Sequence, residues 1–155
     1  MNIFVLDLDP TKCSEYHLDK HSIKMVVEYA QLLCGVHHLT GSTYDIPYKL
    51  SHKNHPSSIW VRDSYENYNW LCELALQLSK EYTYRYEKRH KSQDVIEWCI
   101  ENKPNLPIKG KISPFSFVLP DDCKVECVVE SYRNYYRIHK KNIGFWKKRD
   151  IPHWF

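Results

Sequence analysis

The sequence predicts an all-α fold: a compact single-domain helical bundle over residues 1–155, with a short extended N-terminal segment and a Pro-rich crossing loop. Two stretches, around 17–38 and 64–86, carry apolar residues at three- and four-residue steps, which is the spacing of helices that turn one side to a core. Four prolines between 103 and 120 interrupt regular structure there. A chain of 155 residues is also long enough to bury a core without disulfides.

The N-terminal half is expected to hold an extended arm followed by helices. Residues 3–6 are β-branched and aromatic, as in a short strand or an extended buried arm. Asp9 and Pro10 form a helix start, because Asp caps a first turn and Pro is tolerated there. The strongest helical pattern covers 17–38, and a loop with Gly and Pro breakers follows at 40–53. The core-facing positions of that helix are Ile23, Val26, Val27, Ala30 and Leu33.

The C-terminal half is expected to hold the remaining helices and a docked tail. The tail, from Phe145 to Phe155, contains too many aromatic residues to extend into water, so we expect it to pack on the body. The other expected elements are a turn at 54–58, a short helix through 59–61, a long helix capped by Asp63 or Ser64 that runs to about Tyr86, a helix at 94–100, and a last helix capped by Asp121 and Asp122 with Val125 and Val128 on its apolar side.

Composition favours a phosphate-bearing partner. The formal net charge is only +3, but cations dominate the stretch from Lys124 to Arg149. Aromatic residues make up 14% of the chain and twelve of them are tyrosines, whose rings can stack on a base or line a wet pocket. We therefore expect DNA or a phosphate-bearing nucleotide as ligand.

The cysteines and the absence of targeting patterns bear on where the protein works. The six cysteines form no Cys-x-x-Cys pair and several fall within apolar stripes, so we expect buried free thiols. No secretory signal opens the chain, and no stretch is long and apolar enough to span a bilayer. We expect a cytoplasmic protein with no membrane partner.

Five polar residues are predicted to share one face of the first long helix. His17, His21, Lys24, Glu28 and Gln31 follow one another at steps of four, three, four and three residues. One carboxylate among cations suits a general acid/base, with Glu28 as that group and Lys24 and His21 beside it. The alternative interpretation is a solvated helix face with ordinary ion pairs.

Metal binding is another interpretation of the same region. Cys13, His17 and His21 are spaced one turn apart, which would place three ligands on one side of a helix. The spacing is not the His-Glu-x-x-His of zinc proteases, and no partner cysteine pair exists. There is also no Gly-rich phosphate loop and no carboxylate cluster for magnesium. We expect neither a metal nor a cofactor.

The segment from 52 to 62 has the donors of a phosphate cradle. Amide, hydroxyl and free N–H groups at a helix start attract phosphate, an arginine can form a bidentate fork and a tryptophan can stack on a base. The alternative is an ordinary turn that leads to a core tryptophan. The residues concerned are Lys53, Asn54, His55 and Ser57, with Trp60 and Arg62 after them.

The last helix carries a basic edge. Arg133, Arg137 and Lys140 recur along it with tyrosines between them, a pattern that fits contacts to a nucleic-acid backbone or a multiply charged nucleotide. The alternative is a face that only improves solubility. Because further cations follow the helix, we favour phosphate binding by these three residues.

The order of several short motifs over roughly the first 90 residues resembles that of a known family. It is similar to the small pyrimidine-dimer DNA glycosylases of the endonuclease V type, common in phages and bacteria, and to a set of uncharacterised phage proteins. The motifs are Leu18-Asp19-Lys20-His21, a helix centred on Glu28, Thr43-Tyr44, Asn54-His55-Pro56 and Trp60-Val61-Arg62.

The resemblance implies a compact all-α fold and a defined chemistry. In that family a backbone α-amine attacks the sugar C1′ of a damaged nucleotide and forms a Schiff base, a helix glutamate assists, and β-elimination then cuts the strand. Glu28 matches the glutamate, while His21, Lys24 and Arg62 match the polar surround loosely.

The chain departs from the family at its first residues. The family's nucleophile is a small residue freed of its methionine, whereas Asn2 is bulky, so we expect Met1 to be retained. A desolvated Lys20 or Lys24 is the alternative imine-forming amine.

We therefore expect a phage-type protein that acts as a DNA glycosylase or lyase on a damaged or flipped nucleotide, in the cytoplasm of the infected host cell. Glu28, Lys24 and His21 would form the catalytic group. The alternative is a non-catalytic protein that sequesters a nucleotide, such as a cyclic signalling nucleotide of host antiviral defence, across a homo-oligomer. A plain protein-interaction module is a third possibility. The residues expected to bind ligand or phosphate are His17, Lys20, Lys53, Asn54, His55, Ser57, Trp60, Arg62, Arg133, Arg137 and Lys140.

Overall fold

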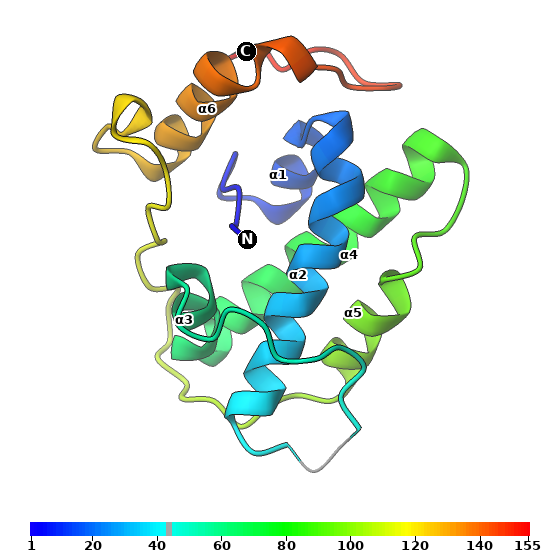
Figure 1. Cartoon of the computed structure of the whole chain (residues 1–155), viewed down its shortest axis with the longest axis vertical. Coiled ribbons are helices and arrows are strands. Elements are labelled where there is room, and N and C mark those ends of the chain that lie inside the picture. The colour runs from blue at the N-terminus through cyan, green and yellow to red at the C-terminus, as the bar shows by residue number, and fades with distance from the viewer. Residues whose placement is uncertain (43–44) are drawn as a thin grey trace.

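The computed structural model describes residues 1–42 and 45–155, and its fold is all-α, as predicted (Figure 1). Thr43 and Tyr44, which belong to the motif order above, lie outside the described residues. No residue in the described ranges belongs to a strand. The elements are α1 (Pro10–Tyr16), α2 (Asp19–Leu39), α3 (Pro56–Asp63), α4 (Tyr65–Tyr86), α5 (Gln93–Glu101) and α6 (Val128–His139), with short 3-10 turns η1 (Asp121–Cys123) and η2 (Lys141–Ile143).

The long helices α2 and α4 form the centre of the fold. Helix α4 packs against α1, α2, α3 and α5, and Figure 1 shows α3 and α5 flanking the lower part of α2. Capping explains two of the helix starts. The Asp9 carboxylate accepts from the Thr11 N–H at 2.9 Å and the Ser64 hydroxyl accepts from the Asn67 N–H at 3.1 Å, as the sequence predicts.

The helix predicted over 17–38 begins two residues later than expected, after a break in the backbone. His17 and Leu18 have extended backbone and separate α1 from α2, which begins at Asp19. Ile23 was assigned to the core stripe, and this assignment is wrong because its side chain is 43% exposed. The assignment of Val26 to the core is confirmed, because its side chain is fully buried.

The start of the last helix also differs from the prediction. Asp121 and Asp122 begin the separate turn η1, and α6 starts only at Val128. Val125, expected on the apolar side of α6, is 46% exposed. Its backbone N–H instead donates to the Ser131 hydroxyl at 2.9 Å. This bond keeps the 124–127 segment beside α6, running in the opposite direction to the helix.

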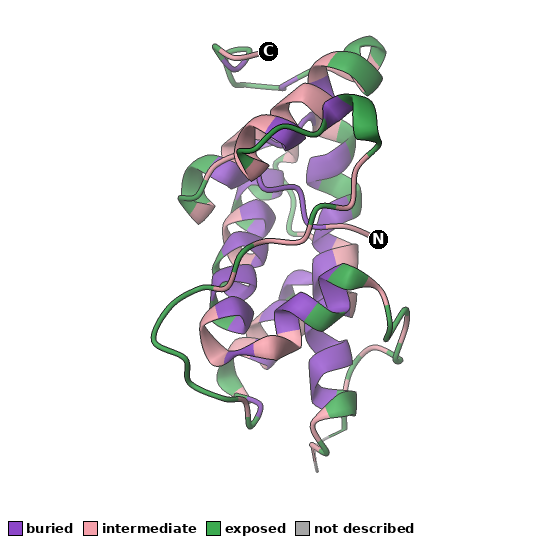
Figure 2. Cartoon of the chain, turned by 90° about the vertical axis from the view of Figure 1, so that its left-hand side faces the viewer, coloured by how far each residue is buried: buried purple, intermediate pink, exposed green. Residues whose placement is uncertain are grey.

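The N-terminal segment is an extended buried arm. Ile3 to Leu6 are all buried, and the arm runs between α6 and the upper part of α2 (Figures 1 and 2). The Phe4 N–H donates to the Tyr29 hydroxyl at 3.2 Å, and the Arg133 guanidinium donates to the Leu6 carbonyl at 3.0 Å. These bonds replace the strand partners that the arm lacks.

The aromatic tail docks on the body, as expected. Trp146 is buried and its indole N–H donates to the Tyr16 carbonyl at 2.9 Å. Phe155 packs edge-on against Trp146, with ring centroids 4.8 Å apart. Trp154 and Phe155 are partly buried and also pack against the core.

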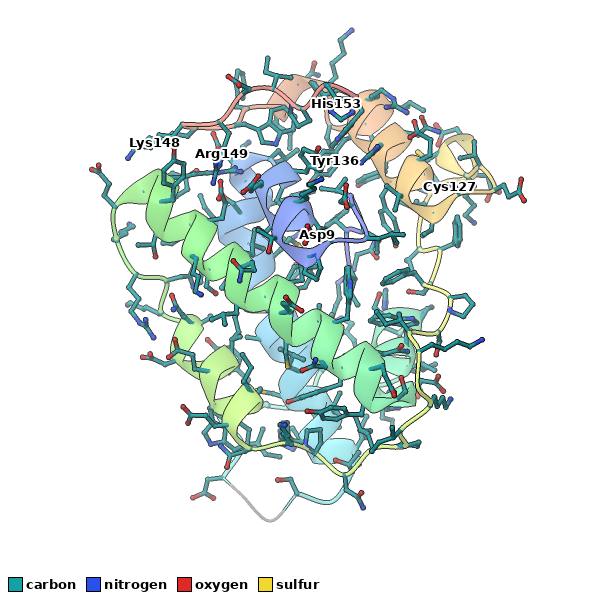
Figure 3. All side chains as sticks on the ribbon, turned by 180° about the vertical axis from the view of Figure 1, so that it is seen from behind. Asp9, Cys127, Tyr136, Lys148, Arg149 and His153 are labelled. Atoms are coloured by element: carbon teal, nitrogen blue, oxygen red, sulfur yellow. The ribbon has the colours of Figure 1, made fainter. Side chains whose placement is uncertain are left out.

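A fully buried arginine joins three parts of the fold. Arg85 on α4 pairs with Glu81 at 2.9 Å and with Asp19 at 3.1 Å, and it also donates to the carbonyls of Glu15 and His17. Figure 3 shows Arg149 beside the same end of α4, and its guanidinium reaches Glu81 at 2.9 Å. Buried ion pairs therefore contribute to the junction of α1, α2 and α4.

Five of the six cysteines are buried free thiols, as predicted, but Cys127 at the start of α6 is exposed. In the described part of the chain, no helix combines the length and apolarity needed to cross a membrane.

Candidate active site

The polar group centred on Glu28 brings the N-terminus to the middle of α2. The Met1 α-amine lies 3.7 Å from Glu28 Oε2, and Lys24 Nζ lies 3.2 Å from Oε1. The Glu28 side chain is 15% exposed and that of Lys24 is 66% exposed. The amine–carboxylate pair is therefore shielded, while Lys24 reaches solvent. We refer to Met1, Lys24, Glu28 and His55 as the Glu28 cluster.

Asn2 fixes the position of the amine. Its side-chain amide donates to the Val118 carbonyl at 2.9 Å, and its oxygen accepts from the Tyr132 hydroxyl at 3.1 Å. The same oxygen accepts from the Ile3 N–H at 2.8 Å. With three bonds on Asn2 and a buried Ile3 behind it, the chain end is held in place beside Glu28 instead of fraying.

His55 faces the same cluster from the start of α3. The pKa of His55 is lowered first by partial burial, then by the positive charges of the N-terminal amine and His52, while Glu28 opposes the shift. His55 Nδ1 accepts from the Ser57 N–H at 3.1 Å and caps α3. In the neutral ring the proton is then on Nε2, so His55 is a hydrogen-bond donor at this site.

The 52–62 segment contributes only part of its predicted phosphate cradle. Lys53 and Asn54 are exposed, and Arg62 donates to the Lys53 carbonyl at 2.6 Å, which ties α3 to the loop before it. Trp60, in contrast, is a core residue. Its ring stacks on Phe115 with centroids 4.9 Å apart and its indole N–H donates to a backbone carbonyl at 3.2 Å.

The remaining cradle residue, Ser57, is also in the interior, with no exposed surface. Neither Ser57 nor Trp60 is presented to a ligand at the surface. The interpretation of Trp60 as a core residue, which the sequence left open, is the one that the structure supports.

The two histidines of the predicted polar face lie in the interior. His17 Nδ1 donates to the Cys13 carbonyl at 2.7 Å and its Nε2 accepts from the Tyr29 hydroxyl at 2.8 Å, so both ring nitrogens are used. His21 stacks on Phe4 with centroids 4.4 Å apart and bonds the Tyr136 hydroxyl at 2.7 Å. His17 is thus away from any surface ligand, and His21 supports the arm that carries the amine. The zinc alternative for Cys13, His17 and His21 has no support, since these contacts use the groups separately.

These buried histidines predict acid sensitivity. Burial lowers the pKa of His17 to about 4 and, helped by the charges of His17, Lys140 and Lys24, that of His21 to about 3. As the pH is lowered from 6.5 to about 4, the unfolded chain binds protons that the folded chain excludes. The free energy of unfolding therefore decreases by up to about 1.4 kcal/mol for each pH unit of acidification and each histidine.

Urea unfolding at pH 6.5, 5.5 and 5.0 measures this slope, above the range in which carboxylates titrate. The substitution His17→Gln should reduce the slope whatever it does to the stability itself. A stability that stays constant from pH 6.5 to 5.0 would contradict neutral burial of these rings.

The predicted basic edge of α6 is mostly engaged within the chain. Arg133 pairs with Asp7 at 3.4 Å and lies 5.3 Å over the Trp154 ring, and Arg137 donates to the Trp154 carbonyl at 2.6 Å and pairs with Glu130. Their chief role is to dock the arm and the tail. Lys140, 5.3 Å over the Tyr135 ring, and the exposed Lys20 are freer to meet a ligand.

Sequence patterns could not reveal that the α-amine belongs to this site. No periodicity relates Met1 to Glu28 or Asn2 to Tyr132, because these pairs meet only after α2 and α6 enclose the arm. One indication was present in the sequence, the apolar character of residues 3–6. A buried segment there implies that the residues just before it also lie against the body.

Comparisons of the chain with protein-family models, with curated proteins and with solved structures return no match. The functional assignment therefore depends on the geometry of the Glu28 cluster.

Proposed function

We propose that this protein binds DNA at a damaged, flipped-out or base-free nucleotide and acts on the sugar as a glycosylase or lyase. The Met1 α-amine would be the nucleophile and Glu28 the acid/base. The observation that carries the proposal is the 3.7 Å approach of amine and carboxylate at a shielded position. A carboxylate at this range can take a proton from the ammonium, which must become neutral before it attacks carbon.

The chemistry balances with these two groups. Nitrogen of the amine attacks C1′, the bond between C1′ and the base breaks, and the base leaves with the electron pair and takes a proton. The nitrogen then loses a proton and its lone pair forms the imine as the C1′–O4′ bond breaks, and O4′ takes up a proton to become the C4′ hydroxyl. At a base-free sugar the aldehyde condenses with the amine and water leaves. Glu28 would accept the C2′ proton, after which the C3′–oxygen bond breaks and the phosphate departs.

Substrate binding would use the exposed cations around the cluster. Lys24 lies beside Glu28 and Lys53 sits on the loop that Arg62 tethers. Such cations contact phosphates without reading sequence. His55 can donate from Nε2 to a sugar or phosphate oxygen. Because Glu28 beside the amine is mostly shielded, we expect the nucleotide to be extruded from the duplex so that its C1′ can reach the amine.

The test is imine trapping. The protein is incubated with duplex DNA that contains one abasic site, or with irradiated duplex, and borohydride reduces the imine to a stable secondary amine. We expect a covalent adduct that Glu28→Gln lowers by about 10²- to 10⁴-fold, the usual contribution of an acid/base group. Glu97→Gln, which removes an exposed carboxylate on α5, is the matched control and should retain the adduct. Wild-type protein without an adduct on either DNA, or an undiminished adduct in Glu28→Gln, would refute the proposal.

One observation favours a second candidate function. The amine and Glu28 form an ion pair, and an ammonium can bind a nucleotide phosphate without chemistry. The same cluster could thus hold a signalling nucleotide of host antiviral defence. Release of intact nucleotide on denaturation, together with no adduct in the trapping experiment, is the result that selects this candidate.

A further inference from the structure

A second polar cluster lies where η1 meets the end of α6. His139 Nε2 is 3.0 Å from both carboxylate oxygens of Asp122, and the Cys123 thiol donates to Asp122 Oδ1 at 3.3 Å. The ligand-type atoms of all three residues lie within 4.8 Å of one another. We refer to Asp122, Cys123 and His139 as the Cys123 cluster.

We propose that the Cys123 cluster binds one divalent ion of the zinc class through Cys123 Sγ, His139 Nε2 and an Asp122 oxygen, with water in the fourth position. Zinc bonds of about 2.0–2.3 Å in a tetrahedron place neighbouring ligand atoms about 3.3–3.8 Å apart. The observed separations of 3.0 and 3.3 Å from Asp122 are close to that edge length. Cys123 Sγ and His139 Nε2 lie within 4.8 Å of each other, so an ion needs the three side chains to adjust by about an ångström to reach tetrahedral edge lengths.

The donor set selects the kind of ion. One thiolate, one imidazole and one carboxylate suit zinc or cobalt, whereas calcium and magnesium prefer oxygen ligands alone. Two anionic ligands balance the double charge of the ion. Asp122 and His139 are exposed, so the site opens to solvent and has room for a water ligand.

The backbone around the cluster is already fixed. Asn134 donates to the Cys123 carbonyl at 3.2 Å, and Ser131 bonds both the N–H and the carbonyl of Val125. The Tyr135 ring lies 5.4 Å from the His139 ring and limits how the imidazole turns. Because α6 holds the turn η1 beside it, little conformational entropy remains to be lost on binding.

Proton release is the chemical signature of such a site. A free thiol is mostly protonated at neutral pH, so an ion must displace the proton of Cys123 when the thiolate forms. The affinity for the ion should rise with pH in this range.

This cluster was not visible in the sequence. Cys123 has no Cys-x-x-Cys partner, and neither Asp122 nor Cys123 stands at a metal-ligand spacing from His139. The antiparallel return of residues 121–127 along α6 brings them together. The proposal is independent of the function proposed for the Glu28 cluster.

Cobalt and zinc titrations of the full chain under reducing conditions test the proposal. We expect one equivalent of cobalt to give the thiolate-to-cobalt charge-transfer band and the visible bands of a four-coordinate site, and zinc to abolish both. Cys123→Ser and His139→Gln should each weaken zinc binding by at least about tenfold, measured by competition with a chromophoric chelator. Cys127→Ser, which alters the exposed cysteine of the same segment, is the matched control and should bind as wild type.

Thermal unfolding in chelator confirms that each variant is folded before its affinity is compared. Absence of zinc binding by folded wild-type protein would overturn the proposal. So would a folded Cys123→Ser variant with unchanged affinity, or a Cys127→Ser variant that loses the charge-transfer band.

Discussion

Substitution of Arg85 by methionine should lower the free energy of unfolding by about 3–5 kcal/mol, as breaking a buried ion pair does. Arg85 has no exposed surface and serves Glu81, Asp19 and the carbonyls of Glu15 and His17. Methionine fills much of the volume but satisfies none of these acceptors. Glu81 would keep the partly exposed Arg149, 2.9 Å away, as a cation partner.

Urea unfolding followed by circular dichroism measures the loss. Arg89→Met is the matched control, because Arg89 pairs with Asp94 and Glu97 at the exposed surface and its removal should change stability little. Equal stability of the Arg85 and Arg89 variants would show that the junction of α1, α2 and α4 is held by other contacts.

Extension of the N-terminus by a Gly-Ser dipeptide should abolish the borohydride-trapped adduct. Two added residues move the α-amine by up to about 7 Å, beyond reach of Glu28, whereas the native separation is 3.7 Å. The extended chain keeps Lys24 and Glu28, so loss of the adduct isolates the contribution of the amine. Intact mass establishes the first residue of each protein before the trapping experiment.

Lys24→Arg is the complementary variant. A guanidinium preserves a cation beside Glu28 but does not form an imine with an aldehyde, so the adduct should still form. An extended protein that is trapped as efficiently as the native one, together with a Lys24→Arg variant that is not trapped, would transfer the nucleophile to Lys24.

The all-α fold and most helix positions could be predicted because they depend on local signals. Ser64 caps α4 and the apolar steps along α2 and α4 are read directly from the sequence. The break at His17 could not be read, because His17 continues the helical spacing while its ring is satisfied by Cys13 and Tyr29. Tertiary hydrogen bonds decided that boundary.

The candidate site was predictable only in part, for the same reason. Glu28 and Lys24 were found because they lie four residues apart on one helix. His55 was found as a turn residue, but its proximity to the amine depends on how α3 packs beside α2. Arg133 and Arg137 were predicted to bind phosphate, yet their guanidinium groups donate hydrogen bonds to backbone carbonyls of the N-terminal arm and the C-terminal tail.

The most direct measurement is the identity of the amine that carries the trapped sugar. Tryptic digestion of the borohydride-reduced adduct separates the peptide of residues 1–12 from those that contain Lys20 and Lys24. If Glu28 assists the chain end, fragment masses will place the sugar remnant on the α-nitrogen of Met1. A remnant on Lys20 or Lys24, with an unmodified Met1, would contradict the claim that the N-terminal amine is the reactive group.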